Sequence, residues 1–309
     1  MTSEYNLSTT YLQLLSMGGQ LACDIFIIIS GYYGIKKDAV KKIPSYIMTM
    51  YYYNALIFVA SGLLKDIKIN YKELIFPFIW GNWFLIWYLV LLAIGPYITG
   101  AMENIRKEDL KAISFIVFVF WSAIPTFIPK SYMFSNFDTF FIMYFYGNVL
   151  RIYAEEIYAK LSIVRKITFC ALILFYGSVP LIDAVGVLLH NDFILNNADY
   201  FRPCNSVLTI CCSMGIFVLF CNKTFFNDWI NKTASLLLGI YLIHDNSMLR
   251  DIIWNVISPN VAYKESMLLL IVHSTVKISI VFIVCALIEI SRKKLWELVR
   301  LLRMTNEII

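Results

Sequence analysis

Charged residues are scarce in this sequence, and that scarcity excludes a soluble protein. Only 15% of the 309 residues are Asp, Glu, Lys or Arg, while 60% are hydrophobic and the mean hydropathy is +0.69. Soluble domains carry roughly 25% charged and about 45 to 50% apolar residues. The surplus apolar surface requires lipid, which also excludes a disordered or collagen-like chain. The net charge of +5 is too small to predict nucleic acid as a partner.

Recognisable catalytic and metal-binding spacings are also missing. The seven cysteines lie mostly within apolar runs and form no CxxC pair, which excludes a secreted disulfide scaffold and predicts small core residues. The sequence holds three histidines and no HExxH, GxSxG, phosphate-loop or dinucleotide fingerprint. It therefore predicts neither a metal site nor a bound cofactor.

Long apolar windows occupy most of the chain. A helix needs about 20 residues to cross roughly 30 Å of hydrocarbon, and nine windows of about this length are bounded by charge, Pro or Asn. They predict an all-α, polytopic integral membrane protein with about nine transmembrane helices in one bundle, forming a single domain over residues 1–309. The windows are residues 12–34, 45–64, 80–99, 112–129, 138–153, 167–189, 205–221, 234–257 and 266–290.

Basic residues are distributed unevenly between loops, which predicts the orientation in the cell membrane. One set of alternate loops, with the C-terminal tail, holds 18 of the 26 Lys and Arg residues, whereas the opposite set holds six. Because cytoplasmic loops retain basic residues, we expect a cytoplasmic C-terminus and, with nine spans, an extracytoplasmic N-terminus. The tail, residues 291–309, alternates basic and apolar residues and is expected to form an amphipathic helix on the inner membrane face.

Polar side chains fall near the middle of several predicted spans. Asp24 lies in the first, His244 with Asp245 in the eighth, and Lys277 in the ninth. Their polar neighbours in the same layer are Asn54, Asn246 and His273. Ionisable groups at this depth are unfavourable unless they pair or line a watery cavity. Two interpretations stay open: Asp24 and Lys277 neutralise each other as a structural pair, or the whole layer lines a polar cavity.

His244 is a candidate general base, because an imidazole accepts a proton near neutral pH. Asp245 is not its natural partner, since adjacent residues on a helix point about 100° apart. His273 and Lys277 are four residues apart, so they share a helix face that we expect to look into the same cavity.

Aromatic residues are dense at the start of the third span, from Trp80 to Tyr88. This density is typical of an interfacial belt, where amphipathic rings lie at the level of the lipid headgroups. It also suits a sugar-stacking surface in which Trp83 and Tyr88 line the cavity. Both interpretations stay open.

Three short runs together resemble a known family. The run from Asp24 to Ile35, with Ser-Gly-Tyr at residues 30–32, is similar to the second-span signature of the acyltransferase family 3 membrane proteins. The run Trp83–Leu89 resembles the family's Trp-aromatic-Leu-x-x-Tyr-Leu span, and Leu238–His244 resembles its late Leu-Gly-x-Tyr-Leu-Ile-His element. The resemblance extends over essentially the whole chain, from about Leu12 to the tail.

The resemblance implies O-acylation, most often acetylation, of a sugar hydroxyl on a cell-surface or exported polysaccharide or a lipid-linked glycan. Acyl-CoA on the cytoplasmic side would be the donor and a co-substrate rather than a bound cofactor. Ser30, Gly31 and Tyr32 would then line the inner half of the cavity. Lys36 and Lys37 would meet the CoA phosphates at its cytoplasmic mouth. The excess of basic residues on the cytoplasmic side of membrane proteins is the alternative explanation for both lysines.

The sequence also departs from the family pattern. Family members have ten core spans, and the first carries an Arg followed about ten residues later by the histidine regarded as catalytic. No residue here corresponds to that histidine, and we expect the first span to be encoded upstream of Met1. The alternatives are an inactive chain, a module completed by a partner, or a transporter-like protein that passes an ion or a lipid-linked sugar.

Overall fold

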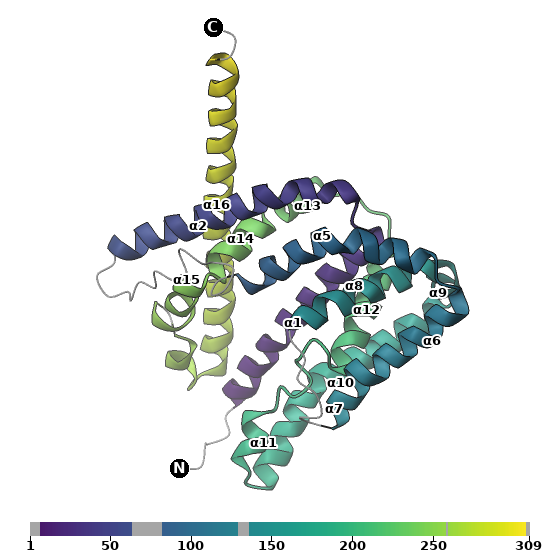
Figure 1. Cartoon of the computed structure of the whole chain (residues 1–309). Helices are drawn as coiled ribbons and strands as arrows, with labels where there is room; N and C mark the ends of the chain where they lie inside the picture. The colour runs from purple at the N-terminus through teal and green to yellow at the C-terminus, as the bar shows by residue number, and fades with distance from the viewer. Residues whose placement is uncertain (1–6, 64–81, 129–135, 258, 307–309) are drawn as a thin grey trace. The chain divides into compact units, whose positions relative to one another are not determined.

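The computed structural model describes residues 7–63, 82–128, 136–257 and 259–306, and every regular element within these ranges is helical (Figure 1). The chain forms two compact units. The first comprises residues 1–43 and 84–224, and the second comprises residues 44–83 and 225–309.

The first unit is a bundle organised around its N-terminal helix. Helix α1 packs against α8, α12 and α10, and α10 packs against α12 along much of its length. Short helices connect these long ones. The elements are α1 (Leu7–Tyr33), η1 (Lys37–Lys42), α5 (Trp83–Glu103), α6 (Lys107–Phe118), η2 (Val119–Ala123), α7 (Ile124–Phe127), α8 (Asn136–Ile152), α9 (Ala154–Ala159), α10 (Leu161–Leu188), α11 (Asp192–Asn196) and α12 (Val207–Cys221).

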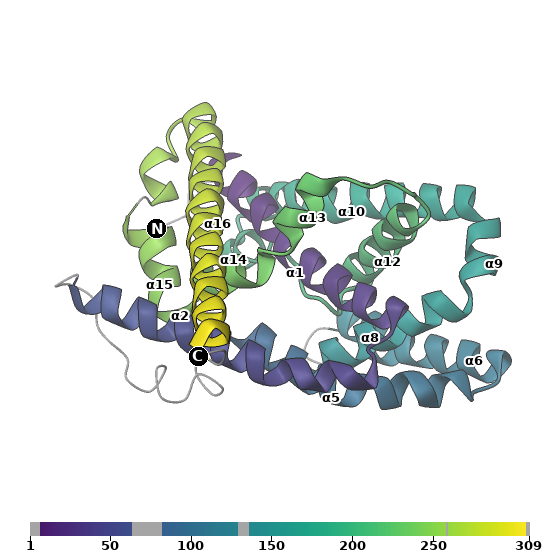
Figure 2. The same ribbon diagram turned by 90° about the horizontal axis from the view of Figure 1, so that it is seen from above.

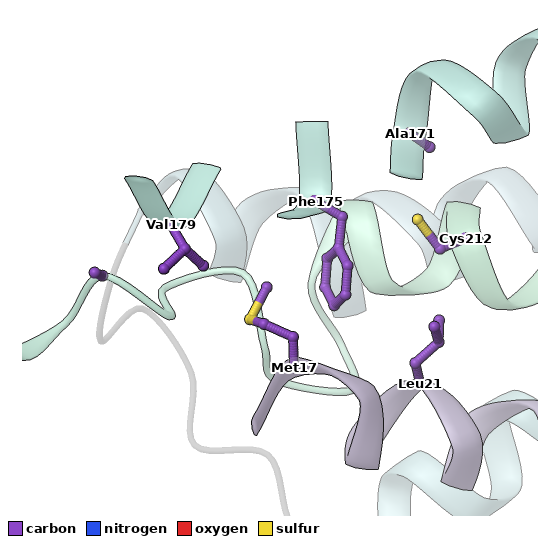
Figure 3. Packing of buried hydrophobic residues seen from close by; sticks show 7 residues of the cluster. Met17, Leu21, Ala171, Phe175, Val179 and Cys212 are labelled. Carbon is purple, nitrogen blue, oxygen red and sulfur yellow. The ribbon is translucent and has the colours of Figure 1, made fainter. Parts of the chain in front are cut away.

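An apolar core joins three of these helices. Met17 and Leu21 of α1 point toward Phe175 of α10, with Val179 and Cys212 beside them (Figure 3). In a membrane such contacts stabilise the bundle by close packing rather than by removing apolar surface from water. The core therefore fixes α1, the helix that carries Asp24 and the Ser-Gly-Tyr run.

The second unit is built on a long C-terminal helix. Helix α14 packs against α16, and short helical segments precede both. Figures 1 and 2 show α16 as one straight rod. The elements are α2 (Ile43–Leu63), α13 (Asp228–Ala234), α14 (Leu237–His244), α15 (Ser247–Asp251), η3 (Ile252–Val256), η4 (Asn260–Tyr263) and α16 (Met267–Asn306).

The all-α membrane fold predicted from the sequence is confirmed. Five helical stretches are long and apolar enough to cross a membrane: α1, α5, α10, α16 and the continuous run Lys107–Phe127. The remaining windows correspond to α2, α8, the shorter apolar α12 and the segment from α14 to η3. That these segments cross the membrane stays a prediction, as does the orientation of the two termini. Leu64, Trp80, Gly81 and Pro129, at the ends of predicted spans, lie outside the described residues.

The eighth window is wrong as a single helix. It breaks at Asp245, which ends α14, and the Asn246 side chain accepts a hydrogen bond from Met248 N–H to begin α15. An Asn side chain caps a helix start because it satisfies one of the first backbone N–H groups. The interrupting polar residues are thus the structural cause of the break.

The fourth window also departs from a regular helix. Its middle, η2, is a π-helical turn, and Pro125 lies two residues after its end. Pro125 has no N–H to donate to the carbonyl of Trp121, four residues earlier. That carbonyl accepts instead from Asn205 Nδ2 at 3.3 Å.

The tail does not form a separate helix. Helix α16 continues from Met267 through Ser291 to Asn306 without a break. Its 40 residues span about 60 Å, twice the hydrocarbon thickness. How the part of α16 after Ser291 lies relative to the membrane stays a prediction.

Candidate functional site

The Ser-Gly-Tyr run lies where α1 crosses α8. The two backbones meet at Gly31 and Gly147: a Cβ atom added to Gly31 would overlap the carbonyl oxygen of Tyr144 and lie 3.0 Å from Gly147 Cα. Small residues at such crossings let membrane helices approach closely. Gly31 therefore has a packing role, and its predicted place in a cavity wall stays untested.

Ser30 and Tyr32 flank this crossing on α1. The Ser30 hydroxyl donates back to the carbonyl of Phe26 at 3.2 Å, within its own helix. The Tyr32 hydroxyl lies 3.0 Å from the hydroxyl of Tyr158, and its ring packs edge-on against Phe217, 5.0 Å away. Tyr32 thus joins α1 to α9 and α12, and its hydroxyl lies at the end of the bundle toward which α1 runs.

A polar network anchors the end of α1. Gly34 adopts a left-handed backbone conformation, φ 71°, which ends the helix. The next residue, Ile35, donates its N–H to the hydroxyl of Tyr144 at 3.1 Å. That hydroxyl also lies 2.8 Å from Thr99 Oγ1, and Thr99 donates to Asn148 Oδ1 at 3.0 Å. The network holds α1, α5 and α8 together immediately before Lys36.

Lys36 and Lys37 are exposed at the beginning of η1. Neither forms an ion pair with a residue of the described ranges, so both ammonium groups face solvent or headgroups. Their placement fits both interpretations of the sequence, a phosphate contact and the positive-inside rule.

Asp24 is the most unusual residue of the first unit. Its side chain is fully buried, and neither carboxylate oxygen accepts a hydrogen bond from any described residue. Its polar neighbours are Cys204 and Ser213. The Cys204 thiol donates to Gln20 Oε1 at 2.6 Å, and the Ser213 hydroxyl donates to the carbonyl of Thr209 at 2.8 Å. The carboxyl group therefore lies among polar atoms whose protons point elsewhere.

The Cys204 thiol belongs to the segment between α11 and α12, outside the helices. Burial, and then the charge of Asp24, raise the pKa of this thiol. Cys204 therefore stays protonated and remains a donor at neutral pH. A neutral thiol adds no second negative charge next to the Asp24 carboxylate.

The third-span aromatics pack among other rings. Tyr88 lies edge-on against Phe26, with ring centroids 5.3 Å apart, and Phe84 contacts both Phe26 and Phe140. Trp83 is the first residue of α5 and is half-buried. These contacts explain Tyr88 as part of an aromatic cluster, and its role toward a sugar stays a prediction.

In the second unit, Asn54 and Asn246 are a buried pair. Asn246 Nδ2 donates to Asn54 Oδ1 at 2.7 Å, and both side chains are nearly inaccessible. This bond ties α2 to the break between α14 and α15. The sequence placed both residues in one polar layer, and the structure brings them into contact.

His244 and Lys277 use backbone carbonyls of the same unit. His244 Nδ1 lies 2.8 Å from the carbonyl oxygen of Ile240, so this nitrogen carries the proton and Nε2 is the acceptor. Lys277 Nζ donates to the carbonyl of Trp254 at 2.7 Å and lies 5.2 Å from its ring centroid. The carbonyl belongs to the π-helical turn η3, in which backbone acceptors become available.

A buried charge cluster in the second unit was missed from the sequence. Glu289 accepts two hydrogen bonds from Arg292, at 2.7 and 2.8 Å, and a third from the hydroxyl of Tyr53. Its carboxyl group packs against Gly239, where a Cβ atom would come within 2.7 Å of Glu289 Cγ. Gly239, the glycine of the Leu-Gly-x-Tyr-Leu-Ile-His run, is the sequence signal for this cluster, because its missing side chain leaves space for the Glu289 carboxyl group.

Possible metal ligands are dispersed. Within residues 7–63, 82–128, 136–257 and 259–306, no three His, Cys, Asp or Glu side chains gather closely enough to hold a metal ion.

Comparison with known proteins gives one match. The family model described as an acyltransferase domain, that of acyltransferase family 3, matches residues 2–290. No curated protein and no solved structure matches the chain. The matched range contains all three runs quoted from the sequence, together with the Gly31 crossing and Glu289, and it ends two residues before Arg292. The chain belongs to acyltransferase family 3, a family of membrane acyltransferases.

Proposed function

We propose that this protein is a membrane O-acyltransferase that moves an acyl group, most simply acetyl, from cytoplasmic acyl-CoA to a sugar hydroxyl. The acceptor would be a cell-surface or exported polysaccharide or a lipid-linked glycan. Membership of the family supports acyl transfer. The donor and the acceptor rest on the resemblance of the Ser-Gly-Tyr and Leu-Gly-x-Tyr-Leu-Ile-His runs.

The reaction requires that the sugar hydroxyl be placed next to the thioester carbonyl of acyl-CoA. The sugar oxygen attacks the thioester carbonyl, an ester C–O bond forms and the C–S bond breaks. The proton lost by the hydroxyl ends on the sulfur of CoA. A base and a set of oxyanion donors accelerate this transfer, and the family's catalytic histidine has no counterpart that we assign among the residues of this chain.

The structural observation that supports the proposal is the burial of the Asp24 carboxylate. A carboxylate buried in a membrane helix is unfavourable without a partner or a function. The fold gives its two oxygens no hydrogen bond from a described residue. Both remain able to accept a hydrogen bond from a substrate hydroxyl, which would orient that hydroxyl for attack. We assign Asp24 this positioning role.

The test uses membrane vesicles that contain the protein, radiolabelled acetyl-CoA and a polysaccharide acceptor. We expect ester-linked label on the glycan, released by mild base, and a loss of at least about tenfold in Asp24→Asn, because a charged hydrogen bond is removed. Asp228→Asn, at an exposed position on α13, is the matched control and should retain full transfer.

Other results would redirect the proposal. Unlabelled glycan with the wild-type protein would refute acyl transfer by this chain. Equal transfer by wild type and Asp24→Asn would remove Asp24 from the acceptor path. Proton-coupled uptake that needs no acyl-CoA and is abolished by Asp24→Asn would instead favour the transporter-like alternative.

The donor contact has a separate test. Replacing Lys36 and Lys37 together with Gln should raise the apparent KM for acyl-CoA, because two charges facing its phosphates are lost. The maximal rate and the topology should not change. An unchanged KM would show that the two lysines only contribute to orientation in the membrane.

A further inference from the structure

A cavity of about 530 Å³ lies within the second unit, between the first turns of α2 and the far part of α16. This volume falls within the usual range for small-molecule sites. The proposed acyl transfer does not use it. Its lining is mostly apolar with a few polar groups: Ser45, Met48, Thr49, Arg292, Trp296, Glu297 and Val299.

The sequence of α16 indicates the depth of the cavity. The apolar stretch of this helix ends at Ile290, and Arg292, Lys293 and Lys294 follow. Trp296 comes next. Basic residues and tryptophan immediately after an apolar span are typical of the membrane–water interface. The cavity therefore lies at the level of lipid headgroups.

Arg292 is held rigidly at the edge of this cavity. Its Nε and Nη2 atoms donate to the Glu289 carboxylate, and the guanidinium carbon lies 5.8 Å from the ring centroid of Tyr53. Only 13% of the Arg292 side chain is exposed, so its position is fixed by packing. A guanidinium group has five N–H donors, and two of them suffice for Glu289. Arg292 can still donate to a phosphate placed in the cavity.

The charges around the cavity match a ligand that carries both signs. Glu289 lies between two cations, because Lys293 Nζ is 3.9 Å away in addition to Arg292. Glu297 adds a second carboxylate, which lines the cavity itself. A purely anionic ligand would place its charge near Glu297, whereas a zwitterion places a cation there.

We propose that this cavity binds the headgroup of a zwitterionic phospholipid with a primary amine, such as phosphatidylethanolamine. The phosphate accepts hydrogen bonds from Arg292 and the ammonium group donates to Glu297. Trp296 lies between these two residues in the sequence and lines the same cavity, where its ring can pack against the ethylene carbons that join the amine to the phosphate. Met48 of α2 and Val299 of α16 add apolar surface to the lining of the cavity. This lipid site is distinct from the proposed transfer reaction.

The test compares lipids retained by the purified, intact protein. The protein is exchanged into mixed micelles with equal amounts of phosphatidylethanolamine and phosphatidylglycerol, and bound lipid is identified by native mass spectrometry. Wild type should retain phosphatidylethanolamine preferentially. Glu297→Gln should reduce that preference about tenfold, because a charged hydrogen bond to the amine is lost.

Two further variants separate binding from folding. Lys294→Gln is the matched control, since Lys294 is exposed on the same helix and does not line the cavity. It should behave as wild type. Arg292→Lys keeps the charge but loses the fork of donors, and should lower retention of both lipids. Circular dichroism checks that each variant remains helical.

Three outcomes would overturn the proposal. The first is equal retention of the two lipids by the wild-type protein. The second is a preference for phosphatidylglycerol, which would show that phosphate alone is recognised. The third is an unchanged preference in Glu297→Gln, which would exclude recognition of the amine by this carboxylate.

Discussion

The crossing of α1 and α8 makes a quantitative prediction for Gly31→Ala. The added Cβ would overlap the Tyr144 carbonyl oxygen and lie 3.0 Å from Gly147 Cα, and both obstacles are backbone atoms that cannot rotate away. Because carbon atoms in favourable contact are roughly 3.5 Å or more apart, the two helices must separate along the crossing. Overpacking of this kind destabilises a protein by about 1 to 3 kcal/mol.

A second glycine on the same helix supplies the control. Gly19 has no atom within 4 Å of a built Cβ, so Gly19→Ala changes helix propensity without a clash. Alanine is favoured over glycine within a helix by about 1 kcal/mol. Both variants gain this propensity, and only Gly31→Ala is opposed by overpacking. The two should therefore differ in unfolding free energy by about 3 kcal/mol at the upper end of the overpacking range.

The measurement is thermal unfolding of the purified protein in detergent, followed by intrinsic tryptophan fluorescence. By the scaling of soluble domains, 1 kcal/mol shifts Tm by about 2 to 4 °C in a chain of 150 to 250 residues. Gly31→Ala should thus unfold several degrees below Gly19→Ala, with the wild type between them. Gly147→Ala should resemble Gly31→Ala. Equal Tm values for Gly31→Ala and Gly19→Ala would refute close backbone packing at this crossing.

Other contacts predict further changes in stability. Asn54→Ala should lower the unfolding free energy by about 1 to 3 kcal/mol, because the buried amide of Asn246 loses its partner; Asn246→Ala should cost more, because the cap of α15 is lost as well, and a double variant as stable as Asn246→Ala would confirm the pair. Gly239→Ala should destabilise α14 packing, since the new Cβ meets the Glu289 carboxyl group, and a neutral result by thermal unfolding would argue against that contact. Tyr144→Phe should cost about 1 kcal/mol and increase hydrogen exchange at the end of α1, which an unchanged exchange profile would contradict.

The spans were predictable because their cause is local in the sequence. A window of about 20 apolar residues needs lipid and a helix wherever it occurs, and α1, α5, α10 and α16 follow that rule. The break between α14 and α15 was harder to predict. Asn246 is polar in either case, and only the fold shows its side chain capping a new helix and bonding to Asn54.

The site was less predictable because it depends on distant partners. The sequence singled out Gly31 as part of a motif, but the residue opposite it, Gly147, comes from another helix. Glu289 was overlooked because it lies near the end of a span, where charge is expected. Its burial against Gly239 and Tyr53 is a property of the packed unit.

The chemistry of hydrogen bonding explains why Asp24 stands apart from the other polar residues of the spans. A hydroxyl within a helix donates to the carbonyl one turn earlier, as Ser30, Thr168 and Ser213 do. A carboxylate only accepts, and the N–H groups within a helix are already used by its own ladder. The Asp183 carboxylate accepts a hydrogen bond from the Thr10 hydroxyl at 2.5 Å. Among the described residues Asp24 has only Cys204 and Ser213 as polar neighbours, and both donate to other acceptors, so its oxygens remain able to accept from a group that carries an O–H or N–H.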